Sequence, residues 1–241
     1  MFRRGPPNLA GLRALAWAMD DVAILPFFPL GLIAYPGEEV SLHIFEPRYR
    51  QLFGELRSGE VGSFVIVPHV GDSLRSRATE LELADVSREY ASGELDVRAR
   101  GVGVVEITGF RAELEGKLYA GGEVQRLDFD LDSGGSAEAF ELRALCGDLM
   151  RALGVHRDLP DPALPSFSFG VGHRVGLTTE QEFGLLTLPT EADRLRYLLG
   201  LVREAIATAE RTSDIKRRVQ ANGHFRYIRS SEDGGLELGA E

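Results

Sequence analysis

Apolar residues near the start of the chain form short runs that are separated by turn signals. A proline-punctuated strand begins at Leu25, and Pro36-Gly37 then marks a turn before a second short strand from Val40 to Phe45. Glu46-Pro47 begins a helix, because proline is tolerated at the first helical position and a carboxylate suits the positive helix start. The spacing i, i+3, i+4, i+7 predicts that the buried face of this helix carries Tyr49, Leu52, Phe53 and Leu56.

The pattern stays mostly strand-like up to about residue 127. The predicted strands are Val61–Val67, Leu81–Val86, Leu95–Ala99, Val102–Phe110 and Leu118–Leu127. Pro68 ends the first of them, and the turn residues Ala91–Glu94 join the second and third into a hairpin. Several short strands with one embedded helix indicate a compact, partly closed β domain, because closure limits exposed strand edges.

After the acidic, Gly-rich boundary segment Asp128–Ser136 the period becomes helical. The first stripe, which Gly154 ends, consists of Phe140, Leu142, Leu145, Leu149 and Leu153. A short helix is predicted from Ser166 to Val175, and Thr179-Glu180-Gln181-Glu182 has the pattern of a capping box. Thr190 can cap the next helix, whose stripe is Leu195, Leu198, Leu199, Val202 and Ile206.

These patterns divide the chain into four segments and predict an α+β fold class. The segments are an N-terminal extension (1–22), a β-rich subdomain (23–130), a helical subdomain (136–229) and a disordered acidic tail (230–241). Arg13 interrupts the apolar run of the first segment, which argues against a signal peptide and leaves Met19 as an alternative start.

Composition narrows the classes of function. The 241 residues are 44% hydrophobic and 27% charged, which is ordinary for a soluble globular protein. No apolar run reaches the length of a membrane span, and a net charge of −10 disfavours nonspecific nucleic-acid binding. The single cysteine, Cys146, excludes an internal disulfide or a multi-cysteine zinc site, and its apolar helical setting indicates inert core. We expect a cytoplasmic protein.

Three short motifs in the opening block resemble a known family. In order they are Leu25-Pro26-Phe27-Phe28-Pro29-Leu30, Tyr35-Pro36-Gly37 and His43-Ile44-Phe45-Glu46-Pro47-Arg48-Tyr49. The block resembles the start of the Lon N-terminal domain family, the substrate-recognition domain of ATP-dependent Lon proteases. The chain is most similar to the small stand-alone proteins that carry this block. The resemblance covers roughly Ile24 to Arg211, and it implies a β-rich, PUA-like pseudo-barrel followed by a C-terminal helical bundle.

The sequence contains no recognisable catalytic, phosphate-binding or metal-binding motif. The nearest approach to a phosphate-binding loop, Gly116-Lys117-Leu118 with Gly109, has the wrong spacing, and Leu118 offers no hydroxyl to a metal. No Gly-x-Ser-x-Gly elbow occurs, and no two histidines have the spacing of helical metal ligands. Gly101-Val102-Gly103 indicates a twisted or closely packed strand rather than a dinucleotide loop, and His43 is expected to form a structural hydrogen bond. We therefore predict no catalytic residue, cofactor or metal ligand, and neither an ATPase nor a Ser–Lys peptidase.

The opening block is also unusually aromatic. Most of its large rings are expected in the core, because large aromatics dominate core burial. One or two that stay exposed would mark a binding surface. The candidate partner-binding residues are Phe27, Phe28, Tyr35, Phe45 and Tyr49.

The leading hypothesis is a non-enzymatic module that binds protein or peptide. By resemblance it recognises unfolded or tagged protein segments for proteolysis or quality control, through an apolar groove between the two halves, with or without a separate protease partner. An alternative is an RNA-binding protein that uses the PUA-like half and the basic, aromatic segment 216–229. The simpler interpretation of that segment is a helix C-terminus whose cations complement the dipole, followed by a packed strand or tail. A third hypothesis is a hydrolase whose site is assembled from distant residues.

Overall fold

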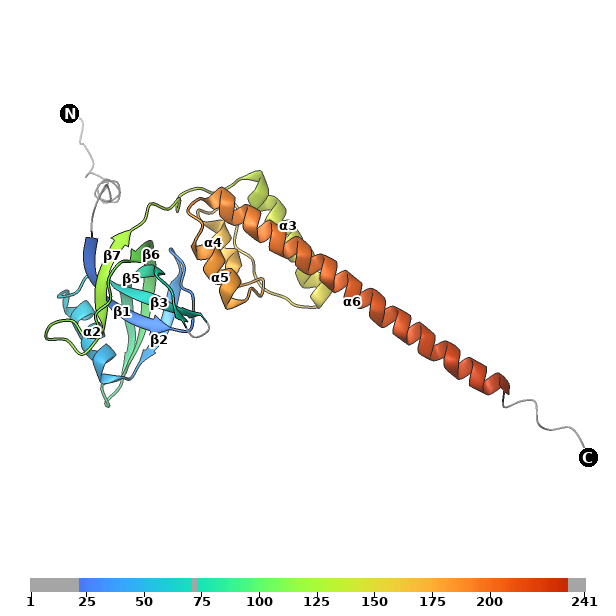
Figure 1. Cartoon of the computed structure of the whole chain (residues 1–241), viewed down its shortest axis with the longest axis horizontal. Coiled ribbons are helices and arrows are strands. Elements are labelled where there is room, and N and C mark those ends of the chain that lie inside the picture. The colour runs from blue at the N-terminus through green and yellow to red at the C-terminus, as the bar shows by residue number, and fades with distance from the viewer. Residues whose placement is uncertain (1–21, 71–72, 234–241) are drawn as a thin grey trace, which may run out of the picture.

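The computed structural model describes residues 22–70 and 73–233, with side chains up to residue 212 apart from Val70. A β-rich half lies beside a helical half, and one long helix extends away from both (Figure 1). In chain order the elements are β1 (Val22–Leu30), β2 (Glu39–Ile44), α2 (Pro47–Ser58), β3 (Phe64–Val70), β4 (Ser73–Leu74), β5 (Arg77–Glu89), β6 (Leu95–Ile107), β7 (Gly121–Arg126), α3 (Ala137–Leu153), α4 (Phe167–Gly172), α5 (Thr179–Leu186) and α6 (Glu191–Asp233). This mixed arrangement of strands followed by helices confirms the predicted α+β class.

The sheet closes on itself. The strand order β1-β7-β6-β5-β3 returns to β1, because β1 pairs with β7 on one side and with β3 on the other. The β1–β7 pair is antiparallel, whereas the β1–β3 pair is parallel and places Phe27 opposite Val65. β2 pairs with β6 outside this ring, and the short β4 pairs antiparallel with the end of β3. The predicted closure is therefore observed, and it leaves few strand edges open to solvent.

The embedded helix forms as its local sequence predicts. Pro47 is the first residue of α2, and Glu46 is its extended N-cap. The helix ends at Gly59, whose φ of 81° is the left-handed conformation that favours glycine after a helix. All four predicted face residues are buried, namely Tyr49, Leu52, Phe53 and Leu56.

β5 and β6 form the predicted hairpin. The prediction that Pro68 ends the preceding strand, β3, is wrong. β3 continues through Pro68 to Val70, and Pro68 lies opposite Leu30 in the parallel pair with β1. A proline lacks a donor but keeps its carbonyl. That carbonyl accepts a hydrogen bond from the amide of Arg75 at 3.0 Å, so the strand is not interrupted.

Gly101 lies where the β1–β2 connection crosses β6. A Cβ atom at this position would lie 2.3 Å from the carbonyl oxygen of Tyr35. The amide of Gly101 donates to the carbonyl of Glu38 at 2.9 Å, and the carbonyl of Gly101 accepts from the amide of Gly37 at 2.8 Å. The close packing predicted for this strand is therefore present at Gly101, and it holds the connection 35–38 in place.

Side chains pack into three clusters. Phe27 and Phe28 point to opposite faces of β1 and enter two different clusters of the β half, one of which α2 covers. The third cluster fills the helical half, and it includes Tyr35 from the β half. The two halves therefore share a hydrophobic core at their junction.

In the β half, a buried carboxylate pairs with an arginine whose side chain is 25% exposed. Glu80 is 2% exposed, and its carboxylate accepts from Nε and Nη2 of Arg126 at 2.8 Å each. The hydroxyl of Ser63 donates to the same carboxylate at 2.6 Å. Two parallel bonds from arginine and one from serine satisfy a carboxylate that has lost its water.

Two predictions in the helical half require correction. In α3 the buried face is Ala139, Leu142, Cys146, Leu149 and Met150. Phe140 and Leu153 are 54% and 58% exposed, because only one side of α3 packs on the rest of the half. In α5 the capping box is formed by Thr178 and Gln181, one residue earlier than predicted. The sequence offers two overlapping Thr-x-x-Gln/Glu patterns, and the helix uses the first.

α6 is longer than predicted. Thr190 caps it as expected, accepting from the amide of Asp193 at 3.1 Å. The helix continues for 43 residues to Asp233, about 65 Å of length. Residues 230–233 therefore belong to α6 and not to a disordered tail, since no proline interrupts the chain after Pro189. The rest of the predicted tail, and nearly all of the predicted N-terminal extension, lie outside the described residues.

Candidate functional site

Tyr35 joins the two halves of the molecule. Its ring stacks on Phe169 of α4, with ring centres 4.8 Å apart and planes inclined by 19°. Its hydroxyl donates to the main-chain carbonyl of Glu182 in α5 at 3.0 Å. Burial, together with the nearby carboxylates of Glu182 and Glu38, raises the pKa of Tyr35 far above its ordinary value. Tyr35 is therefore a neutral, fully buried element of the junction.

His173, just after α4, bridges carboxylates from both halves. Nδ1 lies 2.8 Å from Oε1 of Glu182, and Nε2 lies 3.1 Å from Oε2 of Glu38. Burial by itself would lower the pKa of His173, but hydrogen bonds to Glu38 and Glu182 outweigh burial and raise the pKa to about 9. The ring is therefore a cation at neutral pH that ties the β1–β2 connection to α4 and α5.

A buried arginine supports α4 from the other side. The guanidinium of Arg194 is fully buried and bonds to Glu191 at 2.9 Å, to the hydroxyl of Ser168 at 2.9 Å and to the carbonyl of Asp130 at 2.5 Å. It also lies 4.3 Å from the ring centre of Phe169. Phe169 therefore stacks on Tyr35 and also contacts the guanidinium of Arg194. These two contacts fix the position of the Phe169 ring.

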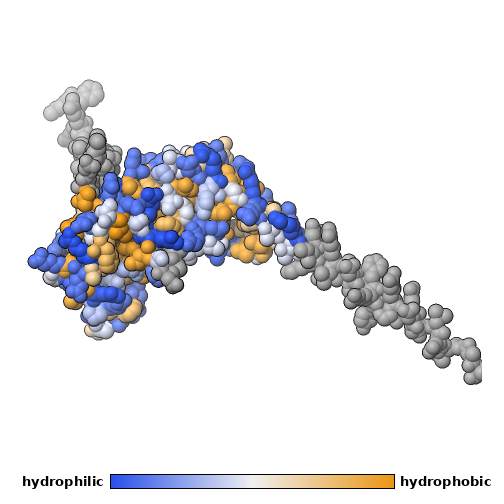
Figure 2. All heavy atoms as spheres, in the orientation of Figure 1, coloured by the Kyte–Doolittle hydropathy of each residue, from blue (hydrophilic) through white to orange (hydrophobic). Residues whose placement is uncertain are grey.

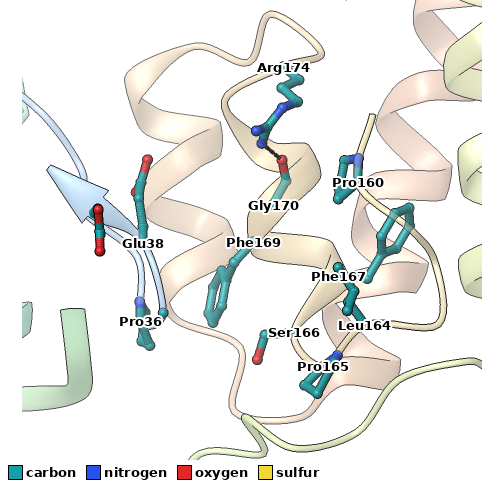
Figure 3. Close-up of a pocket in the computed structure, with 12 residues that line it drawn as sticks. Pro36, Glu38, Pro160, Leu164, Pro165, Ser166, Phe167, Phe169, Gly170 and Arg174 are labelled. Atoms are coloured by element: carbon teal, nitrogen blue, oxygen red, sulfur yellow. Dashed lines mark hydrogen bonds between the residues drawn. The ribbon is translucent and has the colours of Figure 1, made fainter. Parts of the chain in front are cut away.

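A cleft of about 400 Å³ opens beside this junction, and we call it the inter-half cleft (Figure 3). One wall is the β1–β2 connection with Pro36 and Glu38, and the facing wall is α4 with Phe169. The rest of the lining combines apolar side chains with the polar side chains of Glu39, Ser166 and Arg174. The remaining lining residues are Gly37, Glu39, Pro160, Leu164, Pro165, Ser166, Phe167, Gly170 and Arg174. The volume lies within the range of about 300–1,000 Å³ that is usual for ligand pockets.

The backbone at the mouth of the cleft is unusual at one residue. Ser166 has a φ of 51°, the left-handed conformation that few residues other than glycine adopt. Its hydroxyl donates to the carbonyl of Leu131 at 2.8 Å, and its amide donates to the carbonyl of Ser133 at 3.1 Å. These bonds fix the turn that starts α4 and so set the position of Pro165 and Phe167.

Four of the five aromatic residues predicted to meet a partner are buried. Phe27 and Tyr35 are fully buried, and Phe28 and Tyr49 are each 6% exposed. Phe45 is the exception, with 59% of its surface exposed beside His43. The four buried rings are elements of the core, as most of the set was expected to be, and only Phe45 presents an apolar ring to solvent.

A second, larger groove of about 890 Å³ runs between α3 and α6. Leu149, Leu153 and Leu201 supply its apolar walls, and Ala205 and Ala209 of α6 lie along its length. This groove is confined to the helical half, whereas the predicted site lies between the two halves. The inter-half cleft is therefore the candidate site.

The described residues offer little chemistry. They contain no group of three or more His, Cys, Asp or Glu side chains that could hold a metal ion. Burial raises the pKa of the Cys146 thiol to about 12, in accord with its predicted inert role. His43, expected to form a structural hydrogen bond, has Nδ1 2.7 Å from Asp96. Within the part of the chain that the structure describes, no helix is long and apolar enough to cross a membrane.

Sequence reasoning did not identify the residues that build the cleft and its support. Glu38 and His173 are 135 positions apart, so no local spacing connects them. Phe169 and Arg194 lie in segments that the sequence marked only as helical. The one sequence signal close to the site was the Tyr35-Pro36-Gly37 turn, of which two residues line the cleft.

Solved structures share this fold. A Lon N-terminal domain protein from Xanthomonas campestris aligns with a TM-score of 0.57 at 24% identity, over 74% of this chain and 98% of that one. The N-terminal domain of the Lon protease of the Mycobacterium avium complex aligns with a TM-score of 0.51 at 20% identity, over 75% and 98%. The chain thus has the fold of Lon N-terminal domains, as its motifs indicated. No protein-family model matches the sequence, and no curated protein matches it.

Proposed function

We propose that this protein is a non-enzymatic recognition module that binds apolar segments of other proteins in the inter-half cleft. The observation that carries the proposal is the cleft itself, in which prolines and Phe169 face the β1–β2 connection across the junction. The fold supports the class of function, because the similar chain from Mycobacterium avium is the N-terminal domain of a protease.

The lining of the cleft selects the kind of segment. Pro36, Pro165 and Leu164 present apolar surface without hydrogen-bond donors, so apolar side chains enter without losing water-mediated bonds. Folded proteins keep most such side chains inside, whereas unfolded or tagged segments expose them. Glu38 and Glu39 also line the cleft, but Glu38 pairs with His173 and Glu39 lies 3.6 Å from Arg98, so the selection rests on the apolar residues.

The cleft is also preorganised. His173 and Tyr35 fix the β1–β2 wall against α4 and α5, and Arg194 fixes Phe169. A site whose walls are held by other contacts loses little conformational entropy on binding. The same proposal includes a cytoplasmic place of action and delivery of bound segments to proteolysis, either alone or with a separate protease.

Titration of a dye-labelled, chemically unfolded protein into the purified chain tests the proposal. Leu164 lines the cleft and is 53% exposed, so Leu164→Asp alters the cleft without opening the core. We expect binding of the unfolded protein to the wild type and about tenfold weaker binding to Leu164→Asp, the loss typical of an important interface residue.

Leu74→Asp is the matched control. Leu74 lies on β4, is 46% exposed and does not line the cleft. Equal weakening by both substitutions would point to net charge rather than to the cleft, and no binding of unfolded protein by the wild type would reject the proposal.

The RNA-binding alternative rests on the basic segment 216–229. Its backbone belongs to α6, not to a helix end followed by a strand, and its side chains lie outside the described set. The alternative therefore stays a prediction. A gel shift with single-stranded and structured RNA that weakens steeply with salt would favour it.

A further inference from the structure

β2 has one open edge. It pairs with β6 along its whole length, from Glu39 opposite Arg100 to Ile44 opposite Leu95. Along its other side, no strand within residues 22–70 and 73–233 pairs with it. An open strand edge is a template for a further strand, because its outward amides and carbonyls have no partner in the sheet.

The ladder between β2 and β6 shows which main-chain groups face outward. The amide of Gly101 donates to the carbonyl of Glu38 at 2.9 Å, directly before the ladder begins. Bonded and non-bonded pairs alternate in an antiparallel ladder, so every second residue from Val40 onward bonds to β6. The residues whose amides and carbonyls point away from β6 are Glu39, Ser41 and His43. None of these outward groups bonds to another described residue, and all three residues are exposed.

The edge of β2 lacks the features that usually protect an open edge. Its register with β6 is unbroken, and the strand contains neither proline nor lysine. The part of β5 beyond Leu81, which β3 does not pair, is different. Its register with β6 shifts between Leu83 and Asp85 and again between Val86 and Arg88. Such irregularities disrupt an edge as a template, whereas β2 stays regular.

The first part of β1 is also unpaired on one side, because residues 22–26 pair with β7 but not with β3. This part contains Pro26, which lacks an amide donor. Figure 2 shows apolar side chains gathered where β1 begins, on the side of the β half away from the helical half. That edge is therefore neither a complete template nor a continuation of the inter-half cleft.

β2, in contrast, continues directly from the inter-half cleft. Glu39, its first residue, lines the cleft together with Gly37 and Glu38 of the β1–β2 connection. Phe45, whose ring is 59% exposed, follows its last residue. A strand of this length spans about 20 Å. An extended segment along β2 therefore reaches from the cleft to Phe45.

We propose that β2 receives an extended segment of the bound protein as an added strand, with one end of the segment in the inter-half cleft. This inference rests on the proposed function and specifies the conformation of the bound segment. Main-chain bonds to Ser41 and His43 supply affinity that does not depend on the sequence of the segment. Val40 and Leu42 are half-buried on the opposite face of β2, so every second side chain of the segment packs beside them. The preferred segment is therefore extended, with apolar residues at alternate positions.

Amide hydrogen exchange, measured by NMR on the isotope-labelled full chain, tests the added strand residue by residue. In the free protein we expect slow exchange at Val40 and Leu42, which bond to β6, and fast exchange at Ser41 and His43. Saturation with the unfolded protein used in the titration should slow exchange at Ser41 and His43 by about tenfold or more. Exchange at Val40 and Leu42 should change little.

The exchange experiment separates this inference from the function on which it rests. Binding of the unfolded protein without protection of Ser41 and His43 would overturn the added strand and leave recognition by the cleft standing. Absence of binding would reject both. Protection that appears without added protein, and rises with the concentration of the chain, would assign the edge to a second copy and overturn the proposal.

Ser41→Pro provides an independent measurement. It removes an amide that does not bond to β6, and proline is tolerated where a strand amide faces away from the sheet. We expect about three- to tenfold weaker binding of the unfolded protein, because one hydrogen bond is lost. Ser41→Ala is the matched control, since it keeps the amide and should bind as the wild type does. Equal binding by the two variants, with intact far-ultraviolet circular dichroism, would contradict the added strand.

Discussion

The imidazole of His173 lies 3.1 Å from the carboxylate of Glu38, a residue on the other half of the molecule. Its second nitrogen lies 2.8 Å from Glu182. One cation therefore bridges two carboxylates across the junction, directly beside the cleft, and couples the stability of the junction to pH.

The bridge predicts a specific pH dependence of stability. The folded-state pKa of His173, about 9, lies above the ordinary value of 6.5. The stabilisation is therefore fully present below about pH 6.5 and is lost as the pH rises through about 9, and it amounts to about 3 kcal/mol at most. Urea unfolding of wild type and His173→Gln between about pH 6 and pH 10 measures it, and the two curves should converge at the alkaline end. His43→Gln, which alters an exposed histidine, is the control; a constant difference at every pH would contradict the bridge.

Gly101 predicts a link between the barrel and the cleft. Gly101→Ala places a Cβ 2.3 Å from the carbonyl oxygen of Tyr35, so the β1–β2 connection must move. We expect a loss of about 1–3 kcal/mol of unfolding free energy and weaker binding of unfolded protein in the titration. Gly103→Ala is the matched control two residues away, because nothing lies within 4 Å of its added Cβ. Equal effects of the two substitutions would show that glycine flexibility, and not the contact with Tyr35, matters.

The pair of Glu80 and Arg126 in the β half predicts a non-additive result. Arg126→Met leaves the carboxylate of Glu80 buried beside Ser63 without its cation, which should cost about 3–5 kcal/mol. Changing Glu80 to Met in the same protein removes the uncompensated charge and should restore most of the lost stability. Chemical denaturation of the two single variants and the double variant measures this coupling. Simple addition of the two losses would argue against the pair.

Phe45 is the aromatic of the opening block that can meet a partner. Because its ring is 59% exposed, Phe45→Ser should change the unfolding free energy by no more than about 0.5 kcal/mol. Phe27→Ala, at a fully buried position, should cost about 3–5 kcal/mol. If Phe45 also takes part in recognition, Phe45→Ser weakens binding of unfolded protein while stability stays unchanged. Unchanged binding would confine recognition to the cleft.

Local features of the fold could be predicted where a few adjacent residues determine the structure. Glu46 and Pro47 begin α2 as predicted, because capping depends on the backbone of neighbouring residues. Similar reasoning misplaced the cap of α5 by one residue, since Thr178 and Thr179 both satisfy the pattern. It also assigned Phe140 and Leu153 to the buried face of α3, because periodicity gives the spacing of a face but not which neighbours cover it.

The sequence by itself determined the α+β class, the helix after the opening strands and the absence of recognisable catalytic motifs. These follow from short-range backbone preferences and from residue types, which can be read one segment at a time. Only the tertiary structure decided that Tyr35 joins the two halves and that His173 bonds to Glu38. It also decided that Phe45 is the exposed one among the five candidate aromatic residues. Such contacts depend on closure of β1 against both β3 and β7 and on packing between segments more than a hundred residues apart, and no local pattern encodes either.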